Sequence, residues 1–260
     1  MRIAIGLEYD GRGFCGWQSQ PSGCGVQDHL EKAVAGIAGE KLGVTAAGRT
    51  DTGVHASFQV AHFDANATRP LTAWVRGVNT LLPDGIAVAW AKEMPGDFHA
   101  RFAVEERGYR YVLLNHPVRP GLMAGKVGWH HRPLDERAMQ AAAERLLGRH
   151  DFSAFRAAEC QAKSPEKEVR QADIRRQGDF LVCDFRADGF LHHMVRNIMG
   201  CLVHIGAGQA APDWMDELLA HKDRTRAAPT FMADGLYLSY IRYASRFGLP
   251  DGGRDLWPCA

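Results

Sequence analysis

One carboxylate in this chain lies in a glycine-flanked string that is suited to chemistry. Asp51 stands between Gly48 and Gly53, two residues after Arg49. Glycines adopt backbone conformations closed to other residues and let a ligand approach the chain closely, and a neighbouring guanidinium favours the charged form of a carboxyl group. We therefore expect Asp51 to be an oriented, ionised nucleophile or base with Arg49 as its partner. The alternative is an ordinary Asx-turn or helix cap, with Arg49 as a simple surface charge.

A second candidate lies on a segment with alternating aromatic residues. Tyr109 and Tyr111 fall on one face of an expected strand, and Arg110 falls on the other. An aromatic ring that faces a cleft can stack on a nucleobase, which is worth about 1–3 kcal/mol per base. Tyr109 is therefore a candidate base-binding residue. The alternative is that both tyrosines pack in a half-buried sheet.

A charged residue interrupts an apolar helix pattern later in the chain. Arg196 lies near the middle of an expected helix over 192–205. Such a residue is rarely buried without a partner. An acidic residue such as Asp51 would supply one; the alternative is that the guanidinium reaches solvent along its own stem. On this helix His192 and His193 are expected to point in different directions, which argues against a metal pair.

The hydrophobic pattern predicts the same order of elements twice. In residues 1–104 the expected strand, helix, strand, strand, helix and strand are 2–9, 26–38, 42–47, 57–63, 72–81 and 86–93. In residues 105–247 they are 108–115, 134–147, 169–176, 180–187, 192–205 and 236–242, with an extra short helix at 214–220. This βαββαβ order is typical of ferredoxin-like, RRM-like domains. We expect an α+β fold of two tandem halves with a central cleft, followed by a tail at 248–260.

The composition fits a globular protein of one large or two medium domains. The chain has 260 residues, of which 46% are hydrophobic and 23% charged, enough to bury a substantial core. No apolar run reaches the roughly 18 residues of a membrane span, and the N-terminus reads as a strand rather than a signal peptide, so a cytoplasmic location is expected. Six cysteines without C-x-x-C spacing predict free thiols, with Cys183 and Cys201 in the core, and no zinc or iron–sulfur site.

The charges are nearly balanced but unevenly distributed. The net charge is +1; residues 1–100 carry 8 basic and 10 acidic side chains, and residues 101–260 carry 23 and 20. Local basic runs of this kind are usually solvated faces, and they are also what a phosphate-tracking surface needs. The runs are Arg107/Arg110, Lys163/Lys167/Arg170, Arg175/Arg176 and Lys222/Arg224/Arg226.

Several segments together resemble one known enzyme family. They are 8–11 with 16–18, 26–27, 47–51 with 53–56, 98–102, 109–111, 151–152 with 155–156, and 192–197. From about residue 2 to about residue 250 the chain resembles the tRNA pseudouridine synthase A family. Thr52, where an alanine is frequent, is a small departure that leaves Asp51 and both glycines intact.

The resemblance implies isomerisation of uridine to pseudouridine at positions 38, 39 and 40 of the tRNA anticodon stem-loop, by a homodimer that needs no cofactor or metal. It also implies the two-halved pseudouridine synthase catalytic domain. The family's catalytic aspartate falls on Asp51, its base-stacking tyrosine on Tyr109, and its active-site arginines on Arg49 and Arg196. Asp51 could attack C1′, add to C6 of the base, or remove the 2′ proton, and the sequence does not choose among these.

Two other functions fit the same expected fold, because a fold does not fix a function. The main alternative is a non-catalytic RNA-binding protein with tandem RRM-like domains, which would bind tRNA without turnover and tolerate loss of Asp51. The second is a ferredoxin-like enzyme that acts on a small molecule, which would need Asp51 and ignore RNA.

Overall fold

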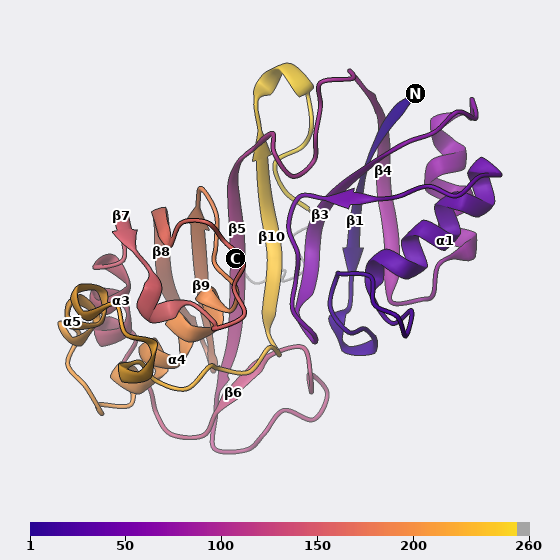
Figure 1. Cartoon of the computed structure of the whole chain (residues 1–260). Helices are drawn as coiled ribbons and strands as arrows, with labels where there is room; N and C mark the ends of the chain where they lie inside the picture. The colour runs from indigo at the N-terminus through magenta and orange to yellow at the C-terminus, as the bar shows by residue number, and fades with distance from the viewer. Residues whose placement is uncertain (254–260) are drawn as a thin grey trace. The chain divides into compact units, whose positions relative to one another are not determined.

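The computed structural model describes residues 1–253, which divide into two compact units. Unit 1 consists of residues 1–105 together with the described residues from Tyr237 onward, and unit 2 consists of residues 106–236. The last seven residues of the expected tail, 254–260, lie outside the described residues. Both units combine helices with mostly antiparallel strands (Figure 1), which confirms the α+β class.

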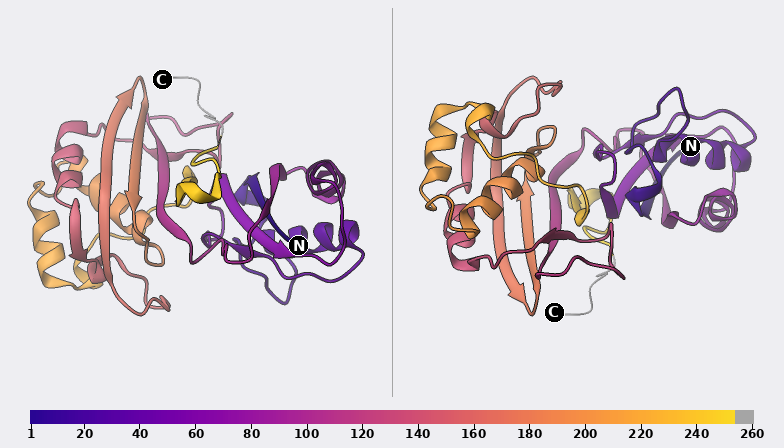
Figure 2. Two further views of the ribbon diagram at one scale, coloured as in Figure 1. Left: turned by 90° about the horizontal axis from the view of Figure 1, so that it is seen from above. Right: turned by 90° about the horizontal axis from the view of Figure 1, so that it is seen from below.

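Unit 1 is a small antiparallel sheet with helices on one face (Figure 2). Its elements are β1 (Arg2–Tyr9), α1 (Val26–Ala38), β2 (Thr45–Ala46), β3 (His55–Asp64), a π-helical segment (Ala73–Gly77), α2 (Val78–Leu81), β4 (Ile86–Met94) and β10 (Leu236–Tyr243), which belongs to this unit from its second residue. β1 lies between β3 and β4, and β2 pairs with β3. The order across the sheet is therefore β4-β1-β3-β2, and β10 pairs in parallel with the start of β3.

The best predicted elements of unit 1 are those with strong local signals. β1 and α1 have the expected bounds. The Asp28 carboxylate accepts a hydrogen bond from the Gly25 amide at the start of α1, and Gly39 ends the helix with a φ of 77°. The expected strand 42–47 shrinks to β2, because the Val44 amide donates to the Glu31 carboxylate (2.9 Å) rather than to a neighbouring strand.

Unit 2 is a second antiparallel sheet with its three helices on one face (Figure 2). Its elements are β5 (Val104–Asn115, from Glu106 onward), β6 (Gly128–His130), α3 (Glu136–Glu144), β7 (Gly148–Asp151), β8 (Glu166–Gln177), β9 (Phe180–Ala187), α4 (Met194–Gly206) and α5 (Trp214–His221). The order across the sheet is β5-β9-β8-β7, with β6 parallel to β5. The expected hairpin between β8 and β9 is confirmed, and Gly178 in its turn has a φ of 58°.

The helix expected over 134–147 is shorter than predicted, and it buries a different set of side chains. The Asp135 carboxylate caps it by accepting from the Arg137 and Ala138 amides, so the helix starts at Glu136. The spacing places Leu134, Ala138, Ala141 and Ala142 on one face of this helix, but Ala141 is exposed in the structure. The buried side chains of this segment are Leu134, Met139, Ala142, Ala143 and Leu146. β6 and β7 were not predicted, since three or four residues carry no measurable period.

The cysteines differ from the expectation in one pair. Cys15 and Cys24 form a disulfide, with their Cα atoms 5.4 Å apart, so these two are not free thiols. Cys183 and Cys201 are buried as expected, and burial raises the pKa of the Cys201 thiol to about 11. Among the described residues, no helix combines the length and the apolar character needed to cross a membrane.

Candidate active site

Asp51 lies in the loop of unit 1 that joins β2 to β3, and backbone hydrogen bonds fix this loop on both sides of it. The Trp17 amide donates to the Thr50 carbonyl (3.0 Å), and the Val54 amide donates to the carbonyl of Asp51 itself (3.1 Å). Further back, the Gln59 side chain donates to the Gly48 carbonyl (2.7 Å). The chain itself therefore sets the position of this half-buried carboxylate.

Thr50 anchors the loop to the core of unit 1. Its side chain is buried, and its hydroxyl lies 2.8 Å from the hydroxyl of Tyr9. Burial raises the pKa of Tyr9 to about 12. The phenol is therefore protonated at neutral pH and can hydrogen-bond with the Thr50 hydroxyl. One residue before Asp51, the chain is thus tied to β1.

Two positions outside the loop, Gly16 and Gly11, leave no room for a side chain because the loop backbone packs directly against them. Gly16 has a φ of 84°, and a Cβ there would lie 2.6 Å from the Thr50 carbonyl oxygen. A Cβ at Gly11 would lie 2.2 Å from the Val54 oxygen. Of the glycines that flank Asp51, Gly53 has a positive φ of 80° and Gly48 does not. Of these two flanking positions, the one after Asp51 therefore has the backbone conformation that favours glycine.

A histidine next to the loop is linked to the segment that follows β1. The Gly11 amide donates to Nδ1 of the buried His55 (3.1 Å), and the same nitrogen lies 3.2 Å from an oxygen of Asp10. The hydrogen bond and ion pair from Arg12 hold the pKa of Asp10 at about 2. No local sequence pattern marks the contact of Asp10 with His55, because the two residues are 45 positions apart in the chain.

Arg49 has an exposed side chain. Within the part of unit 1 that the structure describes, no ion pair joins it to Asp51. The chain by itself therefore leaves this guanidinium turned to solvent.

In unit 2 the two expected aromatic residues of β5 differ in burial. Tyr109 is half-buried, and its ring meets that of Phe190 at 90° with the ring centres 5.1 Å apart. Tyr111 is fully buried, and its hydroxyl donates to the Met232 carbonyl (3.1 Å). Burial raises the pKa of Tyr111 well above its ordinary value. Tyr111 is thus a packing residue, and Tyr109 keeps part of its surface in contact with solvent.

Arg196 lies in the first turn of α4, where the chain segment around Phe231 holds it. Its Nε donates to the Phe231 carbonyl (3.0 Å), and the Phe231 amide donates back to the Arg196 carbonyl (3.1 Å). This segment presses on the helix, since a Cβ at Gly200 would lie 2.2 Å from the Pro229 oxygen. The half-buried guanidinium is therefore oriented by a backbone contact that the sequence did not reveal.

The two histidines before Arg196 do not diverge as expected. α4 begins at Met194, and His193 has a φ of 61°, so neither histidine belongs to the helix. Their ring centres lie 4.0 Å apart. The expectation failed because it assumed helical geometry at 192 and 193.

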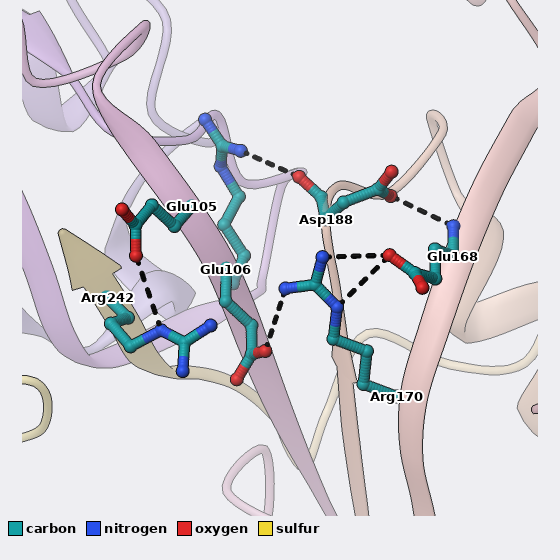
Figure 3. Close-up of polar contacts among 7 residues, drawn as sticks. Glu105, Glu106, Glu168, Arg170, Asp188 and Arg242 are labelled. Carbon is teal, nitrogen blue, oxygen red and sulfur yellow. Dashed lines mark hydrogen bonds and ion pairs between the residues drawn. The ribbon is translucent and has the colours of Figure 1, made fainter. Parts of the chain in front are cut away.

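A network of ion pairs joins the start of β5 to β8 (Figure 3). The buried Glu106 accepts from Arg170 of β8 at 3.1 Å, and Arg170 also donates to Glu168 at 2.8 Å. The strand register shifts between Val169 and Gln171, which places Arg170 in a bulge. A bulge redirects a side chain, and here the redirected arginine reaches across β9 to β5.

Several basic side chains of unit 2 are paired with acidic side chains inside the unit. Arg110 and Arg175 both pair with Asp184 at 2.7 Å, and Arg176 pairs with Glu136 at the same distance. Lys222 lies 3.1 Å from Asp151. These members of the expected basic runs therefore also hold strands and helices together.

Comparison with known proteins places the chain in a family. A family model described as tRNA pseudouridine synthase matches residues 6–103 and 142–244. The chain belongs to the tRNA pseudouridine synthase family. As a member it is an isomerase that converts uridine to pseudouridine in tRNA, and the resemblance seen in the sequence is confirmed. The matched segments include Arg49, Asp51 and Arg196, and Tyr109 lies between them.

Curated relatives match over nearly their full length. The chain is 71% identical over 260 residues to tRNA pseudouridine synthase A of Thiobacillus denitrificans, with all of both chains covered. It is 60% identical over 255 residues to tRNA pseudouridine synthase A of Dechloromonas aromatica, which covers 98% of this chain and 97% of that one. A third relative of the same name, from Chromobacterium violaceum, is 60% identical over 251 residues, 96% of each chain.

Proposed function

We propose that this chain isomerises uridine at positions 38, 39 and 40 of the anticodon stem-loop of tRNAs, with Asp51 as the nucleophile or base. The observation that carries the assignment of Asp51 is its half-buried carboxylate on a loop fixed on both sides by backbone hydrogen bonds. A group held in this way loses little freedom when substrate binds, which favours catalysis by orientation.

The reaction is an internal rearrangement of the nucleotide. The N1–C1′ bond breaks, the base turns, and C5 bonds to C1′ while the proton on C5 is released and N1 gains one. Asp51 would start this rearrangement by attack on C1′, by addition to C6 of the base or by removal of the 2′ proton. Because no electrons or groups leave the nucleotide, we propose that the enzyme uses no cofactor and no metal.

Tyr109 is proposed to stack on the uracil once it has left the helix. Its half-buried ring is oriented by the edge contact with Phe190, and such aromatic pairs prefer this T-shaped geometry. Tyr111 cannot serve in the same way, since its ring is fully buried.

Arg196 and Arg49 are proposed to keep Asp51 ionised when tRNA is bound and to displace the stem strand. Arg196 is held from one side by the Phe231 carbonyl (3.0 Å). The exposed Arg49 suits a contact with an RNA phosphate, because a planar guanidinium matches phosphate oxygens in pairs.

The finer architecture is also a proposal. The order β4-β1-β3-β2 in unit 1 supports a ferredoxin-like half. We propose two tandem halves at 1–104 and 105–247 with a central cleft and a tail at 248–260. We further propose that the enzyme works in the cytoplasm as a homodimer.

Tritium release from a tRNA transcript labelled at C5 of uridine tests this assignment, with Asp51→Ala beside the unchanged enzyme. Asp84, which is exposed in a turn of the same unit, provides a matched control in Asp84→Ala. We expect release by the unchanged enzyme and the control, and none by Asp51→Ala. Release by Asp51→Ala would remove Asp51 from its role. Binding of tRNA without any release would favour the RNA-binding alternative.

A further inference from the structure

The disulfide of unit 1 closes an exposed loop between β1 and α1. Cys15 and Cys24 are half-buried, and the six residues from Gln18 to Gly23 between them are exposed. The Cys15 amide donates to the Cys24 carbonyl (2.9 Å), and the Gln20 side chain donates to the Cys15 carbonyl (3.0 Å). The sulfur–sulfur bond thus joins the two ends of a loop that otherwise presents polar side chains to solvent.

The base of this loop is the chain segment that packs on the Asp51 loop. Trp17, two residues after Cys15, donates its amide to the Thr50 carbonyl (3.0 Å), and Gly16 leaves no space for a Cβ against the same oxygen. On the other side of the base, the Val26 amide donates to the Gly16 carbonyl (3.1 Å) and the Gln27 amide to the Trp17 carbonyl (3.0 Å). The disulfide loop is therefore continuous with the backbone that supports the candidate catalytic residue.

The two sulfurs are placed for exchange with external thiols. Both cysteines are partly exposed, whereas Cys183 and Cys201 are buried and closed to a reagent. The Ser22 hydroxyl lies 3.0 Å from the Cys24 sulfur. This hydroxyl can donate to a thiolate at Cys24, and a stabilised thiolate leaves faster in thiol–disulfide exchange.

We propose that Cys15 and Cys24 form a reversible thiol-oxidation site that controls how unit 1 receives tRNA, an inference that rests on the proposed function. A protein with two thiols reduces the Cys15–Cys24 bond. One of its thiolates attacks the Cys15 sulfur and forms a mixed disulfide with it, and the electron pair of the broken sulfur–sulfur bond goes to Cys24. The second thiol of the reducing protein then attacks its own sulfur in the mixed disulfide and releases Cys15 as a thiol. Two electrons and two protons pass to the cysteines, and a low-molecular-weight disulfide reverses the step.

Reduction acts on the loop and leaves Asp51 in place. The backbone bonds at Trp17, Val26 and Gln27 involve neither sulfur atom, so we expect the support of the Asp51 loop to persist after reduction. Residues 18–23 gain conformational freedom, because the covalent closure of the loop is lost. Because the base of this loop packs beside Asp51, the proposed function brings the loop against bound tRNA, and a loop that must be ordered on binding weakens affinity. The oxidised form therefore binds tRNA more tightly, and the chemical step is the same in both forms.

The test compares the full-length enzyme after oxidation by glutathione disulfide and after reduction by dithiothreitol, with peptide mass confirming the Cys15–Cys24 link. Steady-state tritium release gives KM and kcat, and filter binding gives the Kd for tRNA. Reduction is expected to raise KM and Kd about three- to tenfold and to leave kcat within about twofold.

Variants separate this site from general thiol effects. Cys15→Ser and Cys24→Ser should show the high KM under both conditions, whereas Cys160→Ser, at a half-exposed free cysteine, should keep the full response. Ser22→Ala should slow reduction without changing the KM of the oxidised form.

Three outcomes would overturn the inference. These are equal KM and Kd in both forms, an effect on kcat alone, or no Cys15–Cys24 link after oxidation. In each of them tritium release still stands, so the proposed function survives. Absence of release in both redox forms would instead overturn the proposed function, and the inference with it.

Discussion

The loop that carries Asp51 in unit 1 and the strand that carries Tyr109 in unit 2 are held in place by different interactions. Next to Asp51 the loop is held by backbone bonds at Trp17 and Val54, with glycines where a Cβ would clash, and side-chain bonds from Tyr9 and Gln59 add to them. In β5, backbone pairing with β9 is joined by side-chain contacts, namely the ring of Phe190 on Tyr109 and the Glu106–Arg170 ion pair at the start of the strand. The first region should therefore be sensitive to added atoms and the second to removed ones.

The largest effect is expected from Gly16→Ala. The added methyl group would lie 2.6 Å from the Thr50 oxygen, at a φ of 84° that alanine avoids. Displacement of the Asp51 loop should lower kcat by about a hundredfold, since small misplacements of catalytic groups have effects of this size. Gly23→Ala is the matched control, because Gly23 has a φ of 70° but open space around it. Equal losses in both variants would mean that strain, not packing on Thr50, explains the effect.

The next largest effect is expected from Tyr109→Ala. Loss of a stacking ring costs about 1–3 kcal/mol, so kcat/KM for tRNA should fall about tenfold to a hundredfold. Tyr109→Phe keeps the ring and its contact with Phe190, and it should stay within about threefold of the unchanged enzyme. If Tyr109→Phe lost all turnover, stacking would not be the main role of this residue.

A smaller effect, on stability rather than activity, is expected from Glu106→Gln. The buried carboxylate accepts from Arg170 (3.1 Å), and weakening a buried charged pair costs about 1–3 kcal/mol. Glu168→Gln removes a partner of the same arginine at a more exposed position and should cost less than about 1 kcal/mol. Denaturant unfolding measures both. If Glu168→Gln proved the more destabilising, the buried contact would not be what holds β5.

The smallest effect is a pH dependence of unit 1. Burial, helped by the charges of His99 and Arg2, lowers the pKa of His62 to about 4. Because the unfolded chain binds this proton more readily, stability should fall as the pH drops from about 6.5 towards 4. The variant His62→Asn keeps a hydrogen-bond acceptor for the Ala100 amide. Its melting temperature should therefore fall less steeply than that of the unchanged protein over this pH range. Parallel pH curves for the two proteins would contradict the assignment.

The sequence by itself determined the elements with strong local signals and the family. The period of apolar residues fixed α1 and β1, the paired strands of the β8–β9 hairpin were recognised from their turn, and the string around Asp51 carried the resemblance that the family match confirms. These signals are local because side-chain periodicity, caps and turn residues act over a few positions.

The tertiary structure decided what depends on residues far apart in the chain. It set the buried face of α3, the bulge that sends Arg170 to Glu106, the packing of Gly16 on Thr50 and the contact of Arg196 with Phe231. Even the Cys15–Cys24 bond, only nine residues apart, required the loop between them to turn back on itself. Such contacts depend on which surfaces meet when strands and loops pack, and no local pattern records this.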